Sequence, residues 1–192
     1  AQNDTFTTGL YTANLPTLYT DLAPDTAVSS GQRFAAVGIS AWDAGQGATL
    51  TGVKVAFEGN AGFAQSDLAA LTSDSTSGVA LWVDNGDSVF DEGTDYFVAP
   101  SSAPTWGNPN RVTLAFTGIE IPDNDLVGDS MFVVVRTSAT VSNSDAFRVR
   151  IYNEDVEYNG GEKAEKGFLG DTILSAADYA APVAVITHPD ER

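Results

Sequence analysis

The sequence contains no cysteine, one methionine and one histidine, and it has few basic residues. Without cysteine the chain has no disulfide, thiol nucleophile or cysteine-ligated metal, so a stabilising cation would have to be bound through oxygen. Nine Lys and Arg against 26 Asp and Glu give a net charge of −17, which repels nucleic acid and anionic lipid. No apolar run approaches the roughly 18 residues that span a membrane. We therefore predict no nucleic-acid partner and no membrane span.

The scarcity of histidine also argues against catalysis. Any Ser-His-Asp relay would have to use His188, and zinc catalysis generally needs more than one nitrogen ligand. No glycine-rich phosphate loop follows a predicted strand and opens a helix. The many acidic residues leave a two-carboxylate glycosidase open, but nothing in the sequence marks one pair of them. We predict a protein that is not an enzyme.

Apolar and polar residues alternate along most of the chain. Val53, Val55 and Phe57 alternate with Lys54 and Glu58, which is typical of a strand with one buried face. The same period recurs at 111–117 and 147–151, and residues 78–83 and 131–136 are apolar on both sides, as in central strands. Further strands are predicted at 33–42, 117–121 and 182–187. Helical patterns are confined to single turns at 66–71, capped by Ser66, and at 175–179.

This pattern predicts an all-β fold built as one antiparallel β-sandwich, of the immunoglobulin-like or jelly-roll kind, with one or two short helical turns. A chain of 192 residues can form one such domain, so we assign residues 1–192 to a single domain. The most charged segment, 154–168, is predicted to be a loop or hairpin tip.

The stretch LWVDNGDSVFDEGTD at 81–95 contains the candidate metal site. Calcium takes six to eight oxygen ligands from carboxylates, amides and backbone carbonyls, and glycine permits the sharp turn that gathers them. The candidate calcium ligands are Asp84, Asn85, Asp87, Asp91 and Asp95, with the backbone carbonyl of Val89. The alternative is a solvated hairpin tip in which Asn85 and Gly86 form a type I′ turn. A second acidic cluster lies at 122–129.

Two resemblances follow from these residues. The acidic run resembles an EF-hand or dockerin loop, although Val83 stands in the slot of the first aspartate and Ser88 in that of the central glycine. The segments FAAVGISAW, TLTGVKVAFEG, SGVALWVDNGDSVFD and FVVVRTSATVSNSDAFRVRI are similar to a β-sandwich module of large secreted prokaryotic surface proteins, across about residues 33–152. This resemblance implies an extracellular, structural role.

The N-terminal segment 1–22 is extended in character and is a candidate donor strand. Its side chains Phe6, Leu10 and Tyr11 could pack into the sheet of a neighbouring copy, which would make the partner a second copy of this chain. A head-to-tail contact that does not close gives an open filament. The alternatives are that the segment pairs within its own domain or is disordered. The start at Ala1-Gln2 is typical of a chain after signal-peptide removal, so we predict a secreted protein, extracellular or at the cell surface.

These observations predict a self-assembling subunit of a filament or surface layer, with calcium stabilising the acidic loop. The alternative function is a secreted carbohydrate-binding or adhesion module. In that case Trp106, in the predicted turn PTWGNPN, would stack on a sugar ring, whereas Trp82 is predicted to belong to the core because its strand is apolar on both faces.

Overall fold

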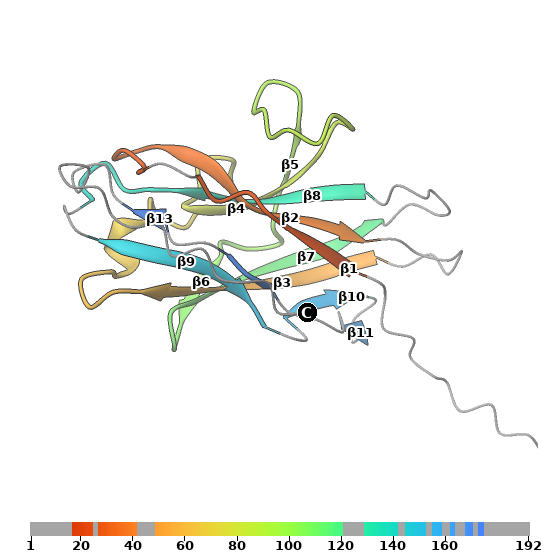
Figure 1. Ribbon diagram of the computed structural model, residues 1–192. Helices are drawn as coiled ribbons and strands as arrows, with labels where there is room; N and C mark the ends of the chain where they lie inside the picture. The colour runs from red at the N-terminus through yellow and green to blue at the C-terminus, as the bar shows by residue number, and fades with distance from the viewer. Residues whose placement is uncertain are drawn as a thin grey trace, which may run out of the picture.

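Two antiparallel β-sheets pack face to face in the computed structural model (Figure 1). The structure describes residues 17–24, 27–41, 49–120, 129–141, 145–152, 155–158, 162–163, 168–170 and 173–174. Within these residues, the structure has no helix long and apolar enough to cross a membrane. The prediction of an all-β sandwich is confirmed.

The first sheet has five strands in the spatial order β1-β2-β8-β4-β5. Their bounds are β1 Thr17–Asp21, β2 Arg33–Ala41, β8 Asp129–Arg136, β4 Val79–Val83 and β5 Tyr96–Val98. β8 lies between β2 and β4, and its residues are apolar on both faces, as a central strand requires.

The second sheet has the order β11-β10-β3-β7-β6, and β9 also pairs with β3 and carries β12 and β13. The bounds are β3 Thr49–Gly59, β6 Thr105–Gly107, β7 Arg111–Glu120, β9 Ala146–Ile151, β10 Val156–Tyr158, β11 Glu162–Lys163, β12 Phe168–Leu169 and β13 Ile173–Leu174. The segment 117–121, which we predicted as a separate strand, continues β7 as far as Glu120.

The main core lies between the sheets and is formed by the alternating residues that the sequence singled out. Val53, Val55 and Phe57 on β3 are buried, as are the corresponding apolar residues of β7 and β9. Each such side chain contributes about 1.5–3 kcal/mol on burial. Lys54 and Glu58 point to the outer face, so the predicted period of two is confirmed.

A second, smaller cluster lies on the outer face of the first sheet. It consists of buried Ala80, Trp82, Phe132 and Val134, and Phe90 and Phe97 pack against it. Trp82 is buried as predicted, but in this outer cluster rather than between the sheets. The doubly apolar strands β4 and β8 therefore need a cover on the solvent side, and part of it comes from the loop that follows β4.

The predicted helical turn at 66–71 is wrong in extent and in its cap. The structure has a 3₁₀ turn at Gln65–Asp67, and the Asp67 Oδ2 accepts a hydrogen bond from the Ala64 amide at 2.6 Å. The chain then becomes extended at Leu68, which is buried and forms a β-bridge with Thr137. Pairing and burial of Leu68 end the turn, which is tertiary context overriding local propensity.

The charged segment 154–168 is not a simple loop. Val156 and Tyr158 are fully buried on β10, which pairs with β3 on one side and with β11 on the other. The pairing of β10 with β11 is antiparallel, with Glu157 opposite Lys163, so the hairpin interpretation holds for this part of the segment. Alternation of Val156, Glu157 and Tyr158 is the strand signal that the surrounding charges concealed.

The candidate donor segment 1–22 is divided by the structure. Residues 17–21 form β1, which pairs antiparallel with β2 of the same domain from Thr17 opposite Ala41 to Asp21 opposite Val37. This part follows the alternative of intradomain pairing, because β1 finds hydrogen-bond partners along β2. Residues 1–16, with Phe6, Leu10 and Tyr11, lie outside the described residues, as do 122–128, 175–179, 182–187 and His188.

Candidate metal centre in the β4–β5 loop

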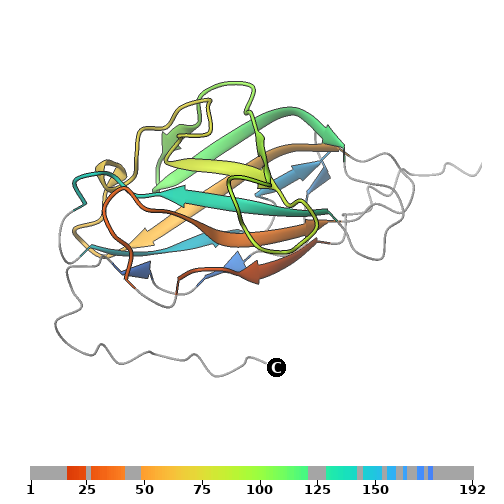
Figure 2. The same cartoon turned by 90° about the horizontal axis from the view of Figure 1, so that it is seen from above.

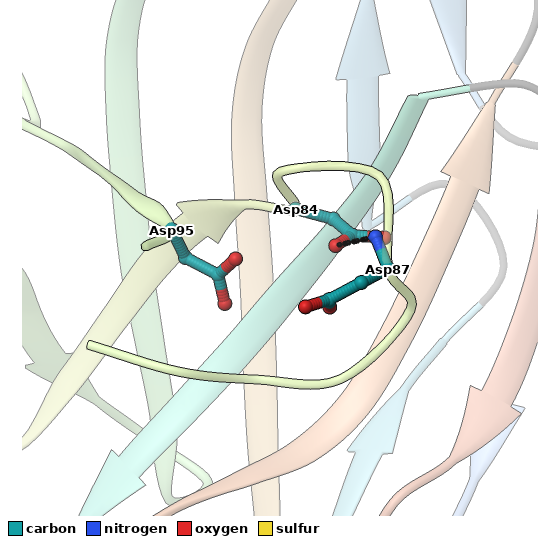
Figure 3. A group of neighbouring side chains, drawn as sticks. All are labelled: Asp84, Asp87 and Asp95. Carbon is teal, nitrogen blue, oxygen red and sulfur yellow. Dashed lines mark hydrogen bonds between the residues drawn. The ribbon is translucent and has the colours of Figure 1, made fainter. Parts of the chain in front are cut away.

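The candidate site is the loop of residues 84–95, which joins two neighbouring antiparallel strands of the first sheet. The β4–β5 register places Val83 opposite Tyr96, so Asp84 and Asp95, the next residues along the chain, begin and end the loop side by side. Figure 3 shows the side chains of Asp84, Asp87 and Asp95 gathered within it. The strand pairing thus positions two carboxylates before any loop geometry is considered.

Asp84 organises the first half of the loop. Its Oδ1 accepts hydrogen bonds from the amides of Gly86 at 3.0 Å and Asp87 at 3.2 Å, and the Ser88 amide donates to both carboxylate oxygens. Gly86 and Ser88 have positive φ values of 104° and 63°, while Asn85 does not. A type I′ turn needs positive φ at both central residues, so that interpretation of Asn85-Gly86 is wrong. The Asp84 carboxylate instead holds this turn through hydrogen bonds from the amides of Gly86, Asp87 and Ser88.

Asp95 fixes the two halves of the loop to each other. Only 7% of its surface is exposed. Its Oδ1 accepts a hydrogen bond from the Asn85 amide at 3.1 Å, and its Oδ2 accepts one from the Asp91 amide at 2.8 Å. Two backbone amides therefore hold the buried carboxylate of Asp95 in place at the base of the loop.

The carboxylates of Asp84, Asp87 and Asp95 converge. Each contributes one oxygen to a group in which all the oxygens lie within 4.8 Å of one another. Calcium binds its oxygen ligands at 2.3–2.6 Å, so two ligands of one ion are at most about 5 Å apart. The spacing fits a shared calcium ion, with Asp95 buried, Asp84 half-buried and Asp87 exposed. The convergence also brings three negative charges together, which a divalent cation would offset.

The structure brings together three of the four predicted aspartate ligands, while Asn85, Val89 and Asp91 take part in hydrogen bonds of the loop. Asn85 Oδ1 accepts a hydrogen bond from the Asp87 amide at 3.0 Å. The Val89 amide donates to Asp87 Oδ1 at 2.9 Å, and its side chain is 64% exposed. Asp91 Oδ1 accepts from the Gly93 amide at 2.8 Å, and Asp91 is outside the group of three carboxylates. These three residues shape the loop.

Sequence reasoning missed that the loop also covers the outer cluster of the first sheet. The ring of Phe90 meets Trp82 and Phe132 edge to face, with centroids 5.5 and 5.9 Å away. Glu92 forms an ion pair with Arg33 of β2 at 2.5 Å. Beside these contacts an open groove of about 430 Å³ runs between the loop and β2. The sequence signal for this packing was the apolar outer face of β4 and β8, because an apolar face needs a cover that shields it from water.

Trp106 does not lie in a turn, as we predicted, but on strand β6. It is half-buried, and its ring stacks on Phe57 with centroids 5.8 Å apart and lies 6.4 Å from Phe63. The ring therefore belongs to the edge of the main core.

No protein-family model matches the chain, and no curated protein sequence matches it. The resemblances to dockerin loops and to secreted surface modules therefore stay predictions.

Proposed function

We propose that the protein is a non-enzymatic, extracellular structural subunit that assembles with copies of itself by β-strand addition, with calcium bound in the 84–95 loop. The observation that carries this proposal is the position of β1. It is the terminal strand of the first sheet as described, and residues 1–16 immediately precede it in the chain. Because this donor segment is attached to a terminal strand, it can reach a neighbouring subunit without any rearrangement of the core.

The edge of β1 is also a more suitable acceptor for an added strand than the edge of β6. Its sequence TLYTD contains neither lysine nor proline, two residues that commonly protect sheet edges from pairing. By contrast β6, at one end of the second sheet, is bordered by Pro104 and Pro109. We propose that residues 1–16 of one copy pair with β1 of the next, since strand addition combines main-chain hydrogen bonds with side-chain pockets.

Calcium would serve assembly by holding the β4–β5 loop in one conformation. Two carboxylates 4.8 Å apart repel by about 1 kcal/mol in water and about 3 kcal/mol at an effective dielectric of 20. The loop holds three of them together, so a divalent cation would turn a repulsive group into a stabilising one. The same loop packs Phe90 on Trp82, which links the ion to the outer face of the first sheet.

The test is to introduce a charge into the apolar side of the donor segment of the full chain. Leu10→Asp should abolish assembly while leaving the thermal melt of the domain unchanged, because the proposal places Leu10 in the sheet of a neighbouring copy and not in its own core. Thr7→Asp is the matched control, with the same charge in the same segment at a polar position. Static light scattering with calcium measures the outcome. If Leu10→Asp assembles as well as Thr7→Asp, residues 1–16 are not the donor.

The carbohydrate-binding alternative has less support. A sugar platform needs an aromatic face open to solvent, and Trp106 already stacks on Phe57. We therefore do not advance it as a second function.

A further inference from the structure

The outer face of the second sheet gathers a large share of the basic residues of a very acidic chain. Of the side chains that the structure describes, four of the chain's nine Lys and Arg residues lie there: Lys54 on β3, Arg111 on β7, and Arg148 and Arg150 on β9. Their side chains are between 31% and 37% exposed. The β3–β9 register sets Ala56 opposite Arg150, and the β3–β7 register sets Ala56 opposite Arg111. We call these four residues the basic face.

The basic face is held rigidly. The guanidinium carbons of Arg111 and Arg150 lie over the ring of Tyr152, 4.3 and 4.4 Å from its centroid. Glu58 fixes the same group from β3, because its carboxylate contacts Arg150 at 2.8 Å and Arg148 at 3.5 Å. Guanidinium groups fixed in this way lose little further conformational entropy when they bind a carboxylate.

Among these four cations and their ion-pair partners, positive charge is in excess. The acidic residues paired with its four cations are Glu58, Asp155 and Glu157. The Asp155 side chain is only 7% exposed, whereas that of its partner Arg111 is 31% exposed. Glu58 is shared between two arginines. A partner that meets this face therefore encounters guanidinium groups more than carboxylates, and an anionic partner is favoured.

The matching surface is the β4–β5 loop, which contains five acidic residues and no basic residue. Asp84, Asp87 and Asp95 form the carboxylate group and Glu92 pairs with Arg33, so exposed Asp91 is the carboxylate that is left to meet a partner. It packs on the outer cluster of the first sheet, so it projects from the opposite side of the sandwich. Figure 1 shows the loop before β5 above the first sheet with β3, β9 and β10 below, and Figure 2, seen from above, shows the loop in front of β2 and β8. We infer that the basic face binds the acidic β4–β5 loop of a second copy of this chain.

This contact rests on the proposed self-assembly and names a second interface within it. The loop and the basic face are different surfaces on opposite sides of the molecule, so the contact is heterologous. Each copy can therefore bind one neighbour through its loop and a second neighbour through its basic face. It also gives the loop a role in assembly that the pairing of residues 1–16 with β1 does not require.

The test is charge reversal in trans, with the critical concentration for assembly measured by light scattering. Arg148→Glu reverses the basic face at its longest ion pair and leaves Arg111 and Arg150 on Tyr152. Asp91→Lys reverses the loop outside the group of three carboxylates. Each variant alone should raise the critical concentration about tenfold, because like charges then meet across the contact. An equimolar mixture should restore it to within about threefold of wild type.

Two controls separate this contact from folding and from net charge. Arg136→Glu makes the same change in charge on β8 of the first sheet and should shift the critical concentration less than about twofold. Arg148→Gln, which adds no charge beside Glu58, covers the case in which Arg148→Glu fails to fold, and it should raise the critical concentration about threefold. Thermal melts identify folded variants.

The outcomes are distinguishable. If wild type assembles and folded Arg148 variants match it, the inference is overturned while the proposed function stands. If each variant weakens assembly but the mixture is no better than its components, the basic face has a different anionic partner and the inference is again overturned. If wild type stays monomeric with and without calcium, the proposed function and this contact fall together.

Discussion

Asp87→Asn is expected to have opposite effects on stability with and without calcium. The substitution removes one negative charge from the group formed by Asp84, Asp87 and Asp95, while its amide oxygen can still accept the hydrogen bond that the Val89 amide now donates to Asp87. Asp87 is exposed, so each repulsion within 4.8 Å lies near the aqueous value of about 1 kcal/mol. In EGTA the free energy of unfolding of the variant should therefore exceed that of wild type by about 1–2 kcal/mol.

Calcium should reverse this order. An ion at a hundred times its Kd stabilises the folded protein by about 2.7 kcal/mol, and Asp87→Asn removes a charged ligand and with it most of that gain. For a chain of this size 1 kcal/mol corresponds to about 2–4 °C in Tm. The variant should melt about 2–8 °C above wild type in EGTA and below it in calcium.

Differential scanning calorimetry of wild type and variant in EGTA and in excess calcium measures all four values. Asp91→Asn is the matched control, because Asp91 lies in the same exposed loop but outside the group of three, and its response to calcium should equal that of wild type. A wild-type Tm that calcium does not raise would refute the ion site. Equal calcium shifts in wild type and Asp87→Asn would refute the role of Asp87.

Two further predictions concern packing around the site. Phe90→Ala should lower the free energy of unfolding by about 2 kcal/mol, less than for a fully buried phenylalanine, and should shift tryptophan emission to the red because Phe90 packs on Trp82; unchanged emission would show that the loop does not cover Trp82. Gly78→Ala should lower the free energy of unfolding measured in urea by about 1–3 kcal/mol, because the added methyl group would collide with the Ala69 carbonyl oxygen. Gly107→Ala is the control, because the nearest such atom is 3.8 Å away. Equal urea midpoints for the two variants would contradict this packing.

The fold could be predicted wherever strands are long and alternate regularly. The buried face of β3 can be predicted from Val53, Val55 and Phe57 without any knowledge of the neighbouring strands, because side chains in a strand point to alternate faces. The short strand β10 escaped prediction because Val156 and Tyr158 stand among charged residues. Its place is decided by pairing with β3, a contact about a hundred residues away in sequence that local patterns do not encode.

The sequence located the candidate site and named all three carboxylates that converge in it, but it did not separate them from Asp91, which lies outside the group. EF-hand spacing directs attention to alternate positions such as Asp87, Val89 and Asp91, whereas the structure selects residues by the hairpin. Asp84 and Asp95 meet because they flank the pair Val83–Tyr96, and Asp87 joins them because Asp84 accepts hydrogen bonds from the amides that follow it.

Self-assembly can be observed directly by negative-stain electron microscopy at high protein concentration, in calcium and then in EGTA. We expect ordered filaments or sheets of the wild-type protein in calcium and their loss or marked shortening in EGTA. Dispersed single particles in both conditions, from protein that calorimetry shows to be folded, would contradict the proposed self-assembly.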